Sequence, residues 1–170
     1  MIWRVFKKRA PDRDGLEWWN AADAAAESPQ PAAIEQLRSR DPAQSTDEVE
    51  QREEMIEGLD HLASIGSDPT LPRVDTQHRV IGSDVCHFVA PATLVADVGT
   101  PGKLFLTSNR LVFSGGRVQA WPWHRLRDIT RTGRELFVTI AGADAVVRLQ
   151  CNTYGDAMVA RHIALRILRR

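Results

Sequence analysis

The 170-residue sequence lacks a long apolar run: no stretch approaches the roughly 20 residues that a membrane-spanning helix needs. It also lacks the apolar core of a signal peptide, since residues 1–9 carry four basic residues where that core would lie, and we expect no secretion. Its only two cysteines, Cys86 and Cys151, are expected to be buried thiols rather than a disulfide, as in a reducing compartment. These absences predict a cytoplasmic protein.

Recognisable catalytic and metal-binding motifs are absent as well. The five histidines are scattered, and no H-E-x-x-H, C-x-x-C or G-x-S-x-G pattern occurs. Cys86 and His87 are adjacent potential metal ligands, but neighbours in a strand point to opposite faces and cannot readily bind one ion. His78 or His124 could approach Cys86 from elsewhere, yet no constellation of acid, base and nucleophile is visible. We therefore expect no enzyme, no cofactor, no metal and no small-molecule substrate.

What the sequence does contain is a series of short β segments between residues 86 and 151. Leu104 and Leu106 fall on one side of a strand with Phe105 and Thr107 on the other, and the pattern resumes at Leu111 after Ser108-Asn109. This predicts a hairpin whose Asn tolerates the left-handed conformation. Gly115-Gly116 predicts a second reversal, and Pro122 a bend or a sheet edge. Further β segments are expected at 126–131, 135–141 and 145–151, and one at 86–98 that is broken or bulged at Pro91. About seven strands result.

The period changes at the end of the chain. From residue 154 to 170, Val159, Ile163 and Ile167 recur every four positions and arginines gather towards the end, which predicts an amphipathic helix with Asn152 or Thr153 as its N-cap. Seven short strands followed by one helix predict an α+β fold: a partly open antiparallel β-barrel capped by the C-terminal helix and preceded by a helical arm.

Two segments carry a family resemblance. G-K-L-F-L-T-S-N-R-L-V-F at 102–113 and W-P-W-H-R-L-R-D-I at 121–129 resemble the GRAM and bacterial pleckstrin-homology-like (PH-like) domains, over about residues 78–170. The resemblance implies a PH-like barrel that binds lipid head groups or peptides, as a non-catalytic scaffold. Lipid-binding relatives carry a basic cluster in the loop between the first two strands. Here that loop, residues 97–103, offers only Lys103, so we expect no phosphoinositide in the usual pocket.

The zero net charge conceals two opposite halves. Residues 1–75 contain 9 basic and 16 acidic residues, a net charge of −7, whereas residues 76–170 contain 13 and 6, a net charge of +7. Opposite charges favour an acidic arm lying against a basic barrel, either in the same chain or on a neighbouring subunit. The alternative is that the acidic residues only solvate one face of a helix.

The arm is expected to comprise residues 1–44 with short helices, an acidic amphipathic helix at 45–65, and a linker at 66–77 before the PH-like domain at 78–170. Ser45 and Glu48 form a capping-box pattern. The apolar stripe of this helix, with Met55, Leu59 and Leu62, must be covered by the barrel or by a partner copy, because an isolated helix of this length is marginal in water.

These features predict a binding or adaptor module that mediates protein–protein interaction or self-association as a homo-oligomer. The alternative is a peripheral module that binds an anionic membrane; nucleic acid is a weaker candidate, because the acidic arm would compete for the same arginines. The candidate partner-interface residues are Trp18, Trp19, Trp121, Trp123, Met55, Leu59 and Leu62. The candidate anion or lipid contacts are Trp3, Lys7, Lys8, Arg9, Lys103, Arg110, Arg125 and Arg127.

Overall fold

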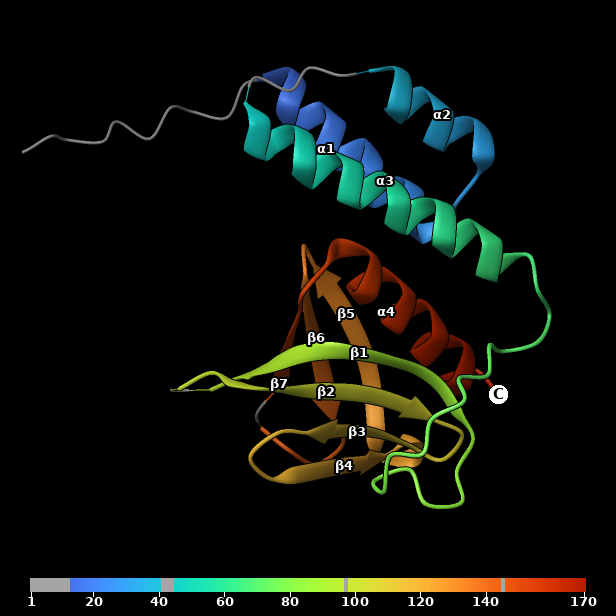
Figure 1. The fold of residues 1–170 in the computed structure, drawn as a ribbon, viewed down its shortest axis with the longest axis vertical. Helices are drawn as coiled ribbons and strands as arrows, with labels where there is room; N and C mark the ends of the chain where they lie inside the picture. The colour runs from blue at the N-terminus through green and yellow to red at the C-terminus, as the bar shows by residue number, and fades with distance from the viewer. Residues whose placement is uncertain (1–12, 41–44, 97, 145) are drawn as a thin grey trace, which may run out of the picture.

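The computed structural model describes residues 13–40, 45–96, 98–144 and 146–170 (Figure 1). Three helices come first: α1 (Arg13–Glu27), α2 (Pro31–Ser39) and α3 (Thr46–Gly66). The strands are β1 (Cys86–Val95), β2 (Thr100–Thr107), β3 (Arg110–Ser114), β4 (Val118–Pro122), β5 (Leu126–Thr132), β6 (Glu135–Ile140) and β7 (Val146–Cys151). A 3-10 turn (Trp123–Arg125) links β4 to β5, and α4 (Tyr154–Leu168) follows the last strand.

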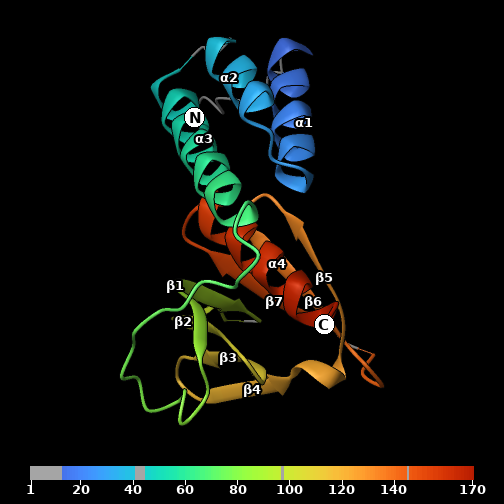
Figure 2. The same ribbon diagram turned by 90° about the vertical axis from the view of Figure 1, so that its right-hand side faces the viewer.

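The seven strands form one antiparallel sheet in the order β4-β3-β2-β1-β7-β6-β5. The long strand β1 pairs with β2 and, through its second half, with β7, so that it joins the two halves of the sheet. Strands β4 and β5 end the sheet, and α4 packs against it (Figure 2). This arrangement confirms the expected PH-like α+β fold.

Two local expectations about the strands need correction. Strand β1 is not broken at Pro91, which is exposed and stays in register opposite Lys103; the irregularity lies between Cys86 and Phe88 instead. The second correction concerns Asn109, because every non-glycine residue in the described part of the chain has negative φ.

The β2–β3 turn is held by side-chain hydrogen bonds. The Thr107 hydroxyl accepts from the backbone N–H of Arg110 at 3.1 Å, and the Asn109 amide donates to Asp84 at 2.6 Å. Burial raises the pKa of the Asp84 carboxyl, but hydrogen bonds from Asn109, Thr107 and Arg110 outweigh burial and lower it. Asn109 therefore serves as a hydrogen-bond donor rather than as a left-handed turn residue.

Helix caps follow the sequence closely. The backbone N–H of Glu48 donates to the Ser45 hydroxyl at the start of α3, and that of Asp156 donates to the Thr153 hydroxyl at the start of α4. The second cap decides between the two candidates in favour of Thr153 over Asn152.

Helix α3 lies across α4, so that α4 is sandwiched between the arm and the sheet (Figures 1 and 2). Met55, Leu59 and Leu62 of α3 are fully buried in the same core as α4 and the barrel. The two helices meet at a pair of glycines: a Cβ added to Gly58 would lie 2.5 Å from the Cα of Gly155. The stripe of α3 is therefore covered by the chain's own barrel helix, which corrects its assignment to a partner interface.

Between α3 and β1, residues 67–85 run over the barrel without forming a helix or strand. The N–H of Val74 donates to the carbonyl of Cys86 at 2.8 Å, and the His87 ring nitrogen Nδ1 lies 2.7 Å from the carbonyl oxygen of Pro72. Ile81 packs in a small second core with Cys86 and neighbouring strand residues. This segment is fastened to the sheet on which it lies.

Candidate functional site

The acidic arm docks on the basic barrel within the same chain. Three carboxylates of α1 and α3 form ion pairs with arginines of β5, of the β5–β6 turn and of α4. The pairs are Asp23–Arg131 at 2.7 Å, Glu27–Arg161 at 2.6 Å and Glu54–Arg134 at 3.0 Å. In the two α1 pairs the arginine side chains are only 5% and 22% exposed, whereas the carboxylates are 55% and 60% exposed. The guanidinium groups of these two pairs are therefore largely buried between the arm and the barrel, while the α1 carboxylates lie at the surface.

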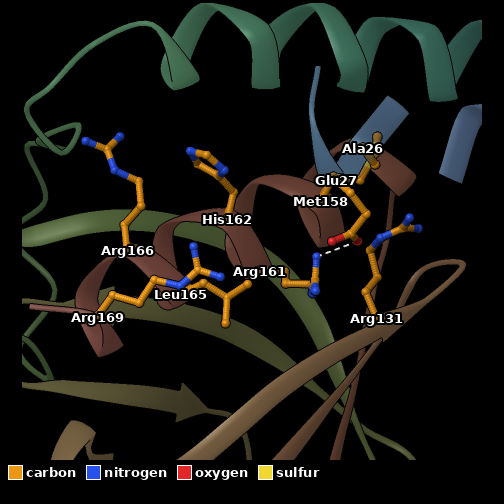
Figure 3. Close-up of a pocket in the computed structure, with 9 residues that line it drawn as sticks. All are labelled: Ala26, Glu27, Arg131, Met158, Arg161, His162, Leu165, Arg166 and Arg169. Atoms are coloured by element: carbon orange, nitrogen blue, oxygen red, sulfur yellow. Dashed lines mark hydrogen bonds and ion pairs between the residues drawn. The ribbon is translucent and has the colours of Figure 1, made fainter. Parts of the chain in front are cut away.

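A cavity of about 160 Å³ lies beside these pairs, between the end of α1, strand β5 and the long side of α4 (Figure 3). Its walls carry four guanidinium groups and one imidazole. We call it the arginine pocket; its lining residues are Ala26, Glu27, Arg131, Met158, Arg161, His162, Leu165, Arg166 and Arg169.

The positive charge of the arginine pocket is only partly neutralised. Arg131 and Arg161 have the carboxylate partners of α1. Arg166 donates to the backbone carbonyls of Asp68 and Pro69 at 3.0 and 2.9 Å, and Arg169 is exposed with no carboxylate within ion-pair distance in the part of the chain described. One end of the pocket therefore carries excess positive charge.

Two buried nitrogen atoms of the pocket have no hydrogen-bond partner among the described residues: Nε2 of His162 and Nη1 of Arg166. Burial, followed by the charges of Arg166, Arg161 and Arg169, lowers the pKa of His162, so the imidazole is neutral near pH 7. The cations of the pocket are hence the arginines alone. Such a site suits an anion, because guanidinium groups donate forked hydrogen bonds to phosphate and carboxylate oxygens.

The tryptophans predicted to form a partner interface are largely internal. Trp18 is buried and donates to the carbonyl of Leu37 at 3.0 Å, while Trp19 is half-buried with its ring 5.3 Å from that of Tyr154. Trp123 is buried and donates to a carbonyl of β2 at 2.8 Å, and Trp121 is half-buried against the core. Trp18 and Trp123 are therefore corrected to core residues, since their surfaces are already covered within this chain.

The residues predicted to contact lipid or anions do not form one cluster in the part that the structure describes. Trp3, Lys7, Lys8 and Arg9 lie outside that part. Lys103, Arg125 and Arg127 are exposed, on β2, on the 3-10 turn and on β5. Arg110 pairs with Asp84 at 3.1 Å, at the opposite end of β3 from Ser114, which faces Lys103.

Sequence reasoning did not predict the arginine pocket, although it placed arginines towards the end of the last helix. A signal was present, because His162, Arg166 and Arg169 follow a spacing of four and three residues that places them on one helix face. Their contribution to a pocket depends on where α1 and α3 dock, which helical periodicity does not reveal.

Clusters suited to metal binding are missing from the described ranges: no three His, Cys, Asp or Glu side chains there lie close enough to hold an ion. Within the same ranges, no helix has the length and apolarity to span a bilayer.

Comparisons with known proteins find likeness to solved structures only. No protein-family model and no curated protein matches it. The C-terminal domain of an unknown protein from Leishmania infantum is similar in structure, with a TM-score of 0.46 and 13% identity over 53% of this chain and 90% of that one. The DH/PH domain of human ARHGEF11, in a ternary complex with human RhoA and its inhibitor, has a TM-score of 0.45 and 11% identity, over 91% of this chain and 54% of that one. The chain thus spans about half the length of that DH/PH structure.

Proposed function

We propose that the chain is a non-catalytic, GRAM-like binding module that recognises a protein partner through the free edge of its sheet. Strand β4 pairs only with β3 in the described part of the structure, so its outer edge is unpaired there. Val118 is 57% exposed, and Gln119 and Ala120 are exposed beside it. This open edge is the observation that carries the proposal.

An unpaired edge offers main-chain donors and acceptors to an extended peptide, which adds to the sheet as a further strand. The other edge is less available, because Arg161 of α4 donates to the carbonyl of Ile129 in β5 at 3.3 Å. At β4, Arg117 precedes the strand and Pro122 ends it, which limits an added strand to about the length of β4 itself. The partner is therefore an extended segment of another protein, or β4 of a second copy.

In this proposal the helical arm stays packed on the barrel and supports it, and does not detach to uncover a binding surface. Burial of Met55, Leu59 and Leu62 against the barrel helix contributes several kcal/mol, at about 1.5–3 kcal/mol for each side chain. The ion pairs between arm and barrel are partly exposed and screened by salt, and pairs at the surface contribute about 0–1 kcal/mol each, so we expect α3 to stay in place when salt is added.

The test compares Val118→Lys with Val146→Lys, a matched change at another exposed valine on the inner strand β7. Proteins captured by the immobilised chain are quantified by mass spectrometry, and the oligomeric state is measured by light scattering. We expect the wild type and Val146→Lys to bind the same partner or to self-associate, and Val118→Lys to lose at least about tenfold in affinity, since lysines on an edge oppose strand addition. Equal binding by both variants would refute the proposal.

Binding to an anionic membrane is the second candidate, favoured by Lys103, Arg125 and Arg127, which are exposed and have no carboxylate within ion-pair distance in the described ranges. Flotation with anionic liposomes, using the wild type and a chain without residues 1–9, tests it. Flotation of the intact chain alone would favour the membrane over the protein partner, whereas absence of flotation from both would remove this candidate.

A further inference from the structure

We propose that the arginine pocket binds the phosphate group of a small soluble compound, at a site independent of the β4 edge. The pocket lies between α1 and α4 and is lined by Arg131, Arg161, Arg166 and Arg169. Phosphate is the ligand class because four guanidinium groups and one imidazole line the pocket (Figure 3), and forked guanidinium donors match phosphate oxygens.

The charge balance around the pocket favours an anion. Two of the four arginines are bound to carboxylates, those of Asp23 and Glu27, at the α1 end. At the other end Arg166 and Arg169 make no ion pair with a described carboxylate, and only the exposed Asp68 carboxyl among the described residues is known to interact with the charge of Arg166, so two guanidinium groups face one carboxylate there. A bound phosphate would supply the missing negative charge at that end.

Two buried nitrogen atoms without hydrogen-bond partners among the described residues also favour a phosphate ligand. Buried polar atoms in proteins nearly always have a partner, yet Nε2 of His162 and Nη1 of Arg166 have none among the described residues. Phosphate oxygens accept hydrogen bonds from both kinds of group. One ligand would thus satisfy the unpaired donors and the unbalanced charge together.

A competing explanation is that the arginines only neutralise helix ends. The carbonyl end of a helix carries roughly half a negative charge, and α1, α3 and α4 all end near the pocket: Glu27 closes α1, and the His162 ring lies about 4.0 Å from a Cβ built on Gly66 of α3. Arg166 does donate to carbonyls just beyond α3. This use engages one guanidinium nitrogen of Arg166, however, and leaves Arg169 unengaged within the described ranges.

The size and rim of the pocket restrict the ligand. A cavity of about 160 Å³ accommodates a phosphate group but not a nucleic-acid strand. The exposed carboxylates of Asp23 and Glu27 stand at its α1 end and repel an extended polyanion or an anionic bilayer. These features favour a soluble phosphate compound over a phosphate fixed in a membrane.

The experiment titrates the full chain with inorganic phosphate and follows the five histidine ring signals by NMR, with calorimetry for affinity. We expect the His162 signal to shift selectively. Arg169→Gln should weaken binding by at least about tenfold without loss of fold, because its side chain is exposed and makes no ion pair with a described residue. Arg117→Gln, which removes an exposed arginine from the β3–β4 turn, should bind phosphate as the wild type does.

A second variant separates ligand binding from a structural role. Glu27→Gln removes the carboxylate that competes for Arg161, so phosphate should bind several-fold more tightly, whereas a purely structural pocket would show no gain. The proposal is overturned if phosphate does not shift His162 at millimolar concentration, or if Arg169→Gln and Arg117→Gln weaken binding equally. A further comparison uses liposomes that carry a phosphoinositide and the soluble inositol phosphate that corresponds to its head group. The proposal is also overturned if the protein binds these liposomes but binds neither inorganic phosphate nor the soluble inositol phosphate.

Discussion

The contact between α3 and α4 gives a quantitative prediction for Gly58→Ala. The added Cβ would lie 2.5 Å from the Cα of Gly155 and 2.5 Å from the Cε of Met158, whereas carbon atoms in contact lie about 3.5–4.0 Å apart. The methionine end can turn aside, but the Gly155 backbone cannot, so the helices must separate by about an ångström. Overpacking costs about 1–3 kcal/mol, and a clash with backbone belongs to the upper part of that range, about 2–3 kcal/mol. Alanine in place of a helical glycine returns about 1 kcal/mol. We expect a net loss of about 1–2 kcal/mol.

Thermal and urea unfolding of the purified chain measure this loss, which corresponds to a fall in Tm of about 2–8 °C for a protein of this size. Gly15→Ala in α1 is the matched control, because its Cβ would meet only the Arg52 side chain at an ordinary 3.6 Å. That variant should be up to about 1 kcal/mol more stable than the wild type. If Gly58→Ala unfolds at or above the wild-type midpoint, the backbone contact between the two helices is not as close as described.

Three further predictions concern single side chains. Glu54→Gln should lower the free energy of unfolding, measured in urea, by about 1–2 kcal/mol, because Glu54 pairs with Arg134 and accepts a hydrogen bond from the first N–H of α4. Glu57 is exposed on the same helix, so Glu57→Gln should leave the stability unchanged. Equal effects of the two substitutions would contradict this prediction. The lowered pKa of Asp84 means that its stabilisation is present above the ordinary value of 3.8 and is lost as pH falls further, so Asp84→Asn should flatten the acid side of a pH–stability curve. Burial raises the pKa of Cys151 to about 12, so a thiol reagent at pH 8 should leave it unlabelled until guanidinium is added; rapid labelling of the native chain would contradict its burial.

The barrel could be predicted from sequence because its signals are local. Alternation around Leu104 and Leu111 and the glycine pair at 115–116 fixed strand positions that need no knowledge of distant residues. The role of Asn109 could not be found in this way, since its partner Asp84 lies 25 residues earlier and reaches the turn only in the folded chain.

The arm shows the same limit more strongly. Periodicity identified the stripe of Met55, Leu59 and Leu62, and composition identified the opposite charges of the two halves. Neither pattern indicates which surface covers the apolar stripe. A helix has the same sequence periodicity whether its apolar face packs against another protein or against the last helix of its own chain. The arginine pocket was missed for this reason, because it exists only where α1 meets α4.

The position of α4 between α3 and the sheet has a consequence for how the molecule unfolds. Gly155 and Met158 adjoin α3, and α4 also contacts β5 and β1, so neither layer can separate without exposing the apolar residues of this one helix to water. Arm and barrel should consequently melt in a single cooperative transition. A residue far from the sheet, such as Gly58, would then influence hydrogen exchange in the strands as strongly as a residue within them.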